Sequence, residues 1–198
     1  VVLDAVARVR AARAEAGRPA PVYCCDPVMG DVGRGFFVRE GIPEFLRDAV
    51  VPQADIVTPN QFELEFLAGQ EISTEADLLA AVATVRATGP STVLVTSVLT
   101  SQTPADSIQM ACVSDEGAWI VTTPMLDMTV RGGGDTTAAI FLAHILTDGP
   151  RVALSRTAAS MYAVLKATHD GGFAEMRLVA EQESIAHPDE VFEVRALA

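Results

Sequence analysis

Residues 22–31, VYCCDPVMGD, contain a short apolar run that ends in an acid, a proline and a glycine. In two later segments, DIVTPN at residues 55–60 and VLVTS at residues 93–97, a short apolar run likewise ends in polar residues. Helical patterns separate these segments, and this alternation is typical of βα units that form a mostly parallel sheet flanked by helices. Ligands bind such sheets at the carboxyl ends of the strands, so the polar residues after each run predict where the site lies.

Capping residues mark the boundaries of the predicted helices. Asn60 begins one helix that Gly69 ends, and Thr74 with Asp77 approximates a capping box at the start of the next. The other expected elements are an opening helix with Val2, Val6 and Val9 on one face, a short helix at 43–49, a hairpin of residues 108–113 and 119–123, helices with apolar stripes at 138–145 and 158–165, a helix at 176–185 and a strand at 191–194.

The composition indicates a globular, acidic protein. The 198 residues are 49% hydrophobic and 20% charged, which suits one domain with a substantial core. The formal net charge of −12 disfavours a nucleic-acid partner. No apolar run approaches the roughly 18 to 20 residues of a membrane helix, and no leader pattern opens the sequence, so we expect a cytoplasmic protein without a membrane partner. The spacing of Cys24, Cys25 and Cys112 matches neither a disulfide framework nor a zinc site, and we expect buried thiols.

The segment RGGGDT, residues 131–136, is the strongest local signal for chemistry. Three glycines let backbone amides approach an anion, and a helix start adds about half a positive charge. Asp135 could then accept a proton from a substrate hydroxyl while those amides hold a phosphoryl group. The alternative is a glycine-rich turn in which Asp135 is only the N-cap of the helix. The single lysine, Lys166, lies outside any GxxxxGK pattern, which excludes a P-loop enzyme.

Acids and hydroxyls follow the other predicted strands. Asp26 and Asp31 are candidate Mg²⁺ ligands, because Mg²⁺ commonly binds one or two carboxylates together with water and phosphate oxygens. Glu63, one turn into the next helix, could reach the metal through water. The alternatives are a turn cap for Asp26, a solvated side chain for Asp31 and a favourable helix-dipole contact for Glu63. Thr96 and Ser97 are placed to meet a phosphate, or only to bond the local backbone.

Taken together, these segments resemble the pyridoxal kinase family of the ribokinase-like superfamily, in order and spacing from about residue 21 to the end. The segments that carry the resemblance are residues 26–31, 50–63, 96–97 and 132–135. The resemblance implies an α/β ribokinase-like fold and ATP-dependent phosphorylation of the 5′-hydroxymethyl group of pyridoxal, and also of pyridoxine and pyridoxamine. It further implies ATP and Mg²⁺ as cofactors, with K⁺ as a candidate monovalent ion, and a homodimer.

The resemblance also implies roles for single residues. Asp135 would be the general base, beside an anion hole formed by the glycine amides. Asp26, Asp31 and Glu63 would arrange the cations. Thr58 would assist them. The residues implied to lie against ATP are Gly132, Gly133, Gly134, Thr96, Ser97 and the stretch from Met125 and Leu126 to Val130.

Two departures from the family pattern affect these expectations. Gly133 stands where the family commonly has threonine or valine, which keeps the amide and loosens the loop. The sequence also begins inside a helical pattern, whereas family members begin with further strands and helices that supply much of the pyridoxal pocket. We therefore expect residues 1–198 to be the C-terminal portion of a single ribokinase-like kinase domain, N-terminally incomplete and with an exposed sheet edge.

Two other functions remain open at the level of sequence. A hydroxymethylpyrimidine kinase of the same superfamily shares the fold and the glycine-rich aspartate loop, and usually differs at the TPNQFE segment. A non-catalytic relative would bind a B6 vitamer or a nucleotide in the same crevice. Competition between pyridoxal and hydroxymethylpyrimidine as substrates distinguishes the first from a pyridoxal kinase. The second would bind its ligand without turnover.

Overall fold

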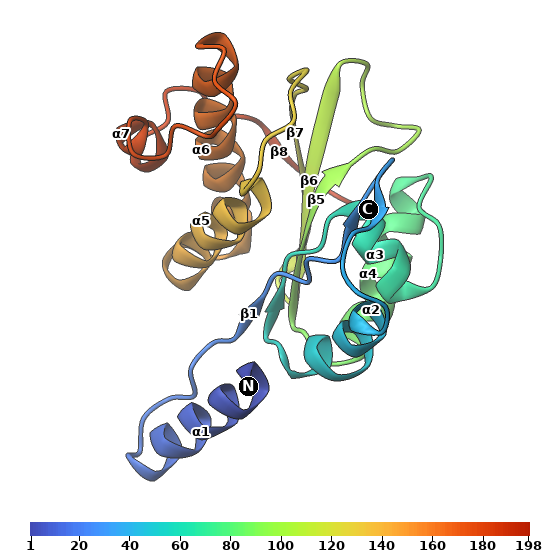
Figure 1. Ribbon diagram of the computed structural model, residues 1–198, viewed down its shortest axis with the longest axis vertical. Helices are drawn as coiled ribbons and strands as arrows, with labels where there is room; N and C mark the ends of the chain where they lie inside the picture. The colour runs from blue at the N-terminus through green and yellow to red at the C-terminus, as the bar shows by residue number, and fades with distance from the viewer.

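The computed structural model describes residues 1–198 and has one six-stranded sheet between two layers of helices (Figure 1). The strand order is β1-β4-β5-β6-β7-β8, and β2 pairs with β3 in a separate hairpin. The strands are β1 (Cys24–Cys25), β2 (Gly30–Asp31), β3 (Gly35–Phe36), β4 (Ile56–Val57), β5 (Thr92–Val98), β6 (Ser107–Ser114), β7 (Gly117–Pro124) and β8 (Val194–Ala196). The helices are α1 (Val2–Glu15), α2 (Ile42–Phe45), the π-helical η1 (Leu46–Val50), the 3-10 turn η2 (Val51–Gln53), α3 (Gln61–Ala68), α4 (Glu75–Arg86), α5 (Gly133–Asp148), α6 (Pro150–Asp170) and α7 (Gln182–Ala186).

The sheet is mixed: its first strands are parallel, and the hairpin expected at residues 108–113 and 119–123 forms its antiparallel part, which β8 extends. β1, β4 and β5 pair in parallel, whereas β6, β7 and β8 are joined by antiparallel pairings. The reason is the short connection after β5, residues 99–106, because a parallel neighbour would need a longer crossover. β1 lies at one edge of the sheet and β8 at the other.

Alternating side chains of the strands build a core on each face of the sheet. Val57 and Val93 belong to the larger core, which α3 and α4 cover. Their neighbours Ile56 and Leu94 belong to the second core, where Phe141 of α5 and several residues of α6 pack against them. Successive strand residues thus face opposite cores, and the expected helices on both faces of the sheet are confirmed.

The predicted helix caps are confirmed. Asn60 and Thr74 each accept a hydrogen bond from the amide three residues on, and the acids there, Glu63 and Asp77, accept one in return. Gly69 ends α3 with φ 68°, a left-handed conformation that glycine adopts without steric cost. Both capping boxes therefore form where the sequence placed them.

The two ends of the chain differ in part from the expectations. The opening helix is confirmed as α1, but none of its side chains is buried, and Arg10 attaches it to Asp55 through a 2.8 Å ion pair. The helix expected at 176–185 is reduced to α7, and the last strand begins at Val194 instead of residue 191. No side chain of α7 is buried, so its apolar pattern finds no surface that would extend the helix.

Two further expectations concern the thiols and the membrane. All three cysteines are free, and Cys25 and Cys112 are buried while Cys24 is half-buried. Among the helices, none combines the length and the apolar character that crossing a bilayer requires.

Candidate active site

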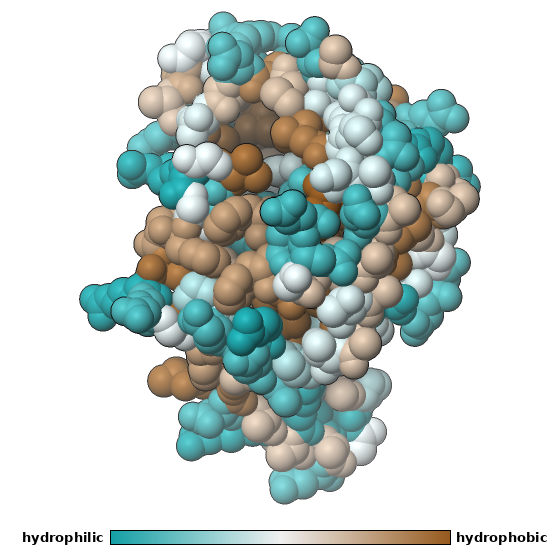
Figure 2. All heavy atoms as spheres, turned by 90° about the vertical axis from the view of Figure 1, so that its right-hand side faces the viewer, coloured by the Kyte–Doolittle hydropathy of each residue, from teal (hydrophilic) through white to brown (hydrophobic).

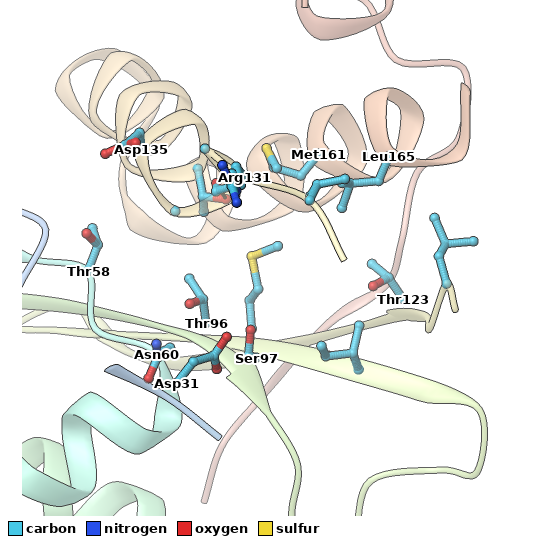
Figure 3. A pocket seen from close by; sticks show the side chains of 18 of the residues that line it. Asp31, Thr58, Asn60, Thr96, Ser97, Thr123, Arg131, Asp135, Met161 and Leu165 are labelled. Carbon is cyan, nitrogen blue, oxygen red and sulfur yellow. Dashed lines mark hydrogen bonds between the residues drawn. The ribbon is translucent and has the colours of Figure 1, made fainter. Parts of the chain in front are cut away.

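A cavity of about 460 Å³ opens between the carboxyl ends of β4 and β5 and the start of α5 (Figure 3). Figure 3 shows Asp135 and Arg131 on one side of this cavity, with Thr58, Thr96 and Asp31 on the opposite side. The predicted site residues that line it are Asp26, Asp31, Thr58, Glu63, Thr96, Ser97, Met125, Val130, Gly132, Gly133, Gly134 and Asp135. Segments separated by more than 100 positions in the sequence thus share one site.

The glycine-rich turn presents unpaired backbone donors to the cavity. Gly132 is the N-cap of α5 with φ 81°, and its carbonyl accepts the Thr136 amide at 3.0 Å. The amides of Gly133, Gly134 and Asp135 precede that first helical bond and have no acceptor within the chain. The alternative that Asp135 is the N-cap is wrong: it occupies the third helical position, makes no capping bond, and its carboxylate is exposed to the cavity.

Asp26 lies beside the same turn with only one of its two carboxylate oxygens hydrogen-bonded. Its Oδ1 accepts the Thr58 hydroxyl at 3.2 Å, whereas its buried Oδ2 has no hydrogen-bond partner. A Cβ built on Gly134 would lie 3.2 Å from that Oδ2, so the acid and the glycine turn are in close contact. Burial raises the pKa of Asp26, the Thr58 bond lowers it, and the negative charge of Asp135 raises it again. An unpaired carboxylate oxygen here suits a cation or a donor from a ligand.

Glu63 holds the loop after β1 against α3. Its Oε1 accepts the amides of Met29 at 2.8 Å and Gly30 at 3.4 Å, and its Oε2 accepts the amide of Asn60 at 2.9 Å. Only 3% of Glu63 is exposed, and this burial raises its pKa to about 7, against the lowering effect of the three amides. Both carboxylate oxygens are thus already engaged by the backbone.

Asp31 and Asn60 complete this side of the cavity. Asp31 Oδ1 accepts the amide of Val32 at 2.8 Å, and Asn60 Nδ2 donates to the carbonyl of Gly30 at 2.8 Å. Gly30 must lack a side chain, because a Cβ there would come within 2.3 Å of the Phe62 ring. Nowhere do three or more acidic, histidine or cysteine side chains gather as a metal site. A cation at Asp26 would therefore need further oxygens from a phosphate and from water.

Thr96 and Ser97 reach the cavity because β5 changes its pairing at this point. The β5–β6 register shifts between Val95 and Val98, while Thr96 forms a parallel bridge with Asn60. Ser97 has φ 54°, the left-handed region that non-glycine residues rarely enter. Both residues leave the regular ladder and line the cavity, as the sequence predicted.

One wall of the cavity was foreseen only in its segment after β7, and its strand and helix residues were not expected as part of the site. It is apolar and comes from the antiparallel strands, the segment after β7 and α6; its members are Ile108, Met110, Leu126, Met128, Met161, Tyr162 and Leu165. The stripe of α6 was predicted only as a packing surface, and nothing in the sequence distinguishes its cavity-lining members from its buried ones. Figure 2 shows the upper half of one face hollowed, with apolar residues in brown around the hollow.

Comparisons with known proteins agree with this geometry. The phosphomethylpyrimidine kinase family matches residues 2–170. Pyridoxal kinase PdxY of Rubrobacter xylanophilus is 52% identical over 200 residues, which cover 100% of this chain and 67% of that protein. Pyridoxal kinase PdxY of Leifsonia xyli is 51% identical over 195 residues, which cover 98% of this chain and 67% of that protein. The chain belongs to the pyridoxal kinase family. It spans about two thirds of the length of the curated relatives it matches.

Solved pyridoxal kinases confirm the ribokinase-like fold of this family in the chain. Pyridoxal kinase from Leishmania donovani in complex with ADP and pyridoxine superposes with a TM-score of 0.90 at 27% identity, covering 100% of this chain and 69% of the other. The pyridoxamine complex of the same enzyme gives a TM-score of 0.87 at 28% identity, with the same coverage. The expected family and fold class are thus both confirmed.

The burial of Glu63 predicts a pH-dependent contribution to stability in this member of the pyridoxal kinase family. Its folded pKa of about 7 lies above the ordinary 4.5, so between these values the folded protein holds a proton that the unfolded chain has released. The contribution of Glu63 to the free energy of unfolding therefore falls as pH rises from about 4.5 to 7. Chemical denaturation of the wild type and Glu63→Gln across this range should show their difference shrinking with rising pH.

At the acidic end of this range, Glu63→Gln should be less stable by about 1 to 3 kcal/mol, because its amide group would face one of the backbone donors. Glu71→Gln, the same change at an exposed position, is the control and should alter stability by less than about 0.5 kcal/mol. A difference between wild type and Glu63→Gln that stays constant with pH would contradict the raised pKa.

Proposed function

We propose that this chain catalyses ATP-dependent phosphorylation of the 5′-hydroxymethyl group of pyridoxal, and of pyridoxine and pyridoxamine. The observation that carries the proposal is the exposed Asp135 carboxylate beside three unpaired amides, in one cavity with the polar ends of β4 and β5. The names of its relatives support the reaction, and the complexes of the Leishmania donovani enzyme with ADP and B6 vitamers support the two substrates.

In the proposed reaction, each part of the turn has a role. The Asp135 carboxylate accepts the proton of the 5′-hydroxyl as that oxygen attacks the γ-phosphorus of ATP. The bond from the γ-phosphorus to the bridging oxygen breaks, and ADP leaves with that electron pair. The amides of Gly133, Gly134 and Asp135 donate hydrogen bonds to the non-bridging oxygens, where negative charge is held during in-line transfer.

The donor set around Asp26 fits Mg²⁺ in part. Asp26 Oδ2 is buried and unpaired beside the glycine turn, which suits a cation that also binds phosphate oxygens and water. When bound, Mg²⁺ would neutralise charge on the phosphates. Thr58 orients Asp26 by donating to its other oxygen, and Asp31 lies on the same side of the cavity. Glu63 acts one step further away, since it fixes the loop that carries these acids.

Replacement of the proposed base tests catalysis against binding. Asp135→Asn should lower kcat for pyridoxal about 10²- to 10⁴-fold, the usual contribution of a general base. The affinity for a non-hydrolysable ATP analogue, measured by calorimetry, should remain within a few fold, since the amides are unchanged. If the wild type binds the analogue and pyridoxal but shows no turnover, the non-catalytic alternative holds and the proposed reaction is rejected.

Removal of the orphaned carboxylate tests the cation site. Asp26→Asn should raise the Mg²⁺ concentration that gives half-maximal activity by about tenfold or more, because one charged ligand is lost. Asp31→Asn is the matched comparison and should shift this concentration less, since Asp31 already bonds the Val32 amide. Titrations of Mg²⁺ at saturating ATP measure both. An unchanged Mg²⁺ requirement in Asp26→Asn would remove Asp26 from the site.

A competition assay separates the two candidate substrates. The family match to phosphomethylpyrimidine kinase favours a hydroxymethylpyrimidine as the rival to pyridoxal. With both compounds present at equal concentration, the wild type should transfer radiolabelled phosphate mainly to pyridoxal, at least about tenfold faster. Preferential labelling of the hydroxymethylpyrimidine would assign the chain to the rival activity instead.

A further inference from the structure

Gln61 is a buried polar residue beside the cavity and not part of its wall. It is the first residue of α3, and its side chain points away from the capping box to two other segments. Its Oε1 accepts the amide of Leu99 at 2.8 Å, and its Nε2 donates to the carbonyl of Ile72 at 3.1 Å. Both ends of this one amide are therefore satisfied, which fixes its orientation.

The bond to Leu99 lies two residues after Ser97, at the end of β5. Ser97 holds φ 54°, a conformation that costs free energy unless its surroundings impose it. The Thr96 amide donates to the carbonyl of Pro59 at 2.9 Å on one side, and Val98 is fully buried on the other. Leu99 itself is exposed, and its amide bond to Gln61 is the first attachment beyond Val98; the next is the bond from the Ser101 amide to the Ser73 carbonyl at 2.9 Å.

We propose that Gln61 is a positioning residue that holds Ser97 in its left-handed conformation and so sets nucleotide affinity. This inference rests on the proposed function and on the expectation that Thr96 and Ser97, which line the cavity, lie against ATP. Gln61 acts through the backbone of Leu99 and touches neither substrate. Its loss leaves Asp135 and the glycine turn unchanged, so the effect falls on ATP.

Two substitutions separate this role from a general contribution to stability. Gln61→Met keeps the length and burial of the side chain but loses both hydrogen bonds. Gln61→Glu keeps an acceptor for the Leu99 amide, yet places a carboxylate against the Ile72 carbonyl and near Glu65, whose Oε1 lies 3.5 Å from Nε2 of Gln61. Gln61→Glu should thus unfold at a temperature at least as low as that of Gln61→Met.

The order of the two variants should nevertheless be reversed for nucleotide affinity, with Gln61→Met binding nucleotide more weakly than Gln61→Glu. Gln61→Met should raise the KM for ATP and the Kd of a non-hydrolysable analogue about three- to tenfold, as expected for one lost hydrogen bond. The KM for pyridoxal should stay within twofold. Gln61→Glu should keep the nucleotide constants near those of the wild type. The control is Gln70→Ala, which removes a 3.1 Å bond to the Asp77 carbonyl near the same helix and should leave both KM values unchanged.

Three results would overturn the inference: nucleotide constants of Gln61→Met equal to those of the wild type, equal losses in Gln61→Met and Gln61→Glu, or parallel increases in both KM values. Each of them leaves wild-type turnover intact and so does not affect the proposed function. A wild type that fails to bind the ATP analogue would instead reject the proposed function and this inference with it.

Discussion

The first turn of α3 is the constraint on which the site depends, because it joins three strand ends that are far apart in the sequence. The carboxylate of Glu63 accepts hydrogen bonds from an amide in the loop after β1 and from the amide of its own N-cap residue, Asn60. Asn60 bonds the Gly30 carbonyl and bridges to Thr96 of β5. Parallel pairing alone would leave these ends side by side and free to move. The capping box makes them one rigid wall, and its satisfied hydrogen bonds stabilise a buried charge that would otherwise be costly.

The electrostatics of the cavity favour a cationic partner. Asp26 and Asp135 lie close enough for the charge of Asp135 to raise the pKa of Asp26, in a chain with a net charge of −12. A polyphosphate entering this field would be repelled if only the carboxylates faced it. Three groups oppose that repulsion: the unpaired amides at the start of α5, the guanidinium groups of Arg34 and Arg131, and any cation at Asp26 Oδ2. Binding of nucleotide and of cation should therefore be coupled.

Local signals were enough to predict most of the elements and the polar half of the site. Asn60, Thr74 and Gly69 mark helix boundaries through short-range bonds, so their roles can be read from the sequence. The β6–β7 hairpin was likewise predicted from the turn between its two apolar runs, but the direction of β6 relative to β5 could not be, because that pairing depends on the whole connection. Likewise, the left-handed turn at Ser97 arises from contacts with α3 and the buried Val98, which are non-local. The C-terminal helix was overestimated because periodicity does not show whether a surface exists to bury it.

The antiparallel half of the sheet, of which the sequence predicted the β6–β7 hairpin, explains why the cavity has two chemical sides. In a fully parallel sheet, the strand next to β5 would also end in a polar loop at this edge. Here β6 begins at this edge and β7 ends there, so Ile108 and Met110 extend an apolar surface beside Thr96. α6 covers that surface with Met161 and Leu165. A ligand with a charged tail and a flat apolar body, as ATP is, thus meets matching surfaces on both sides of the strand reversal.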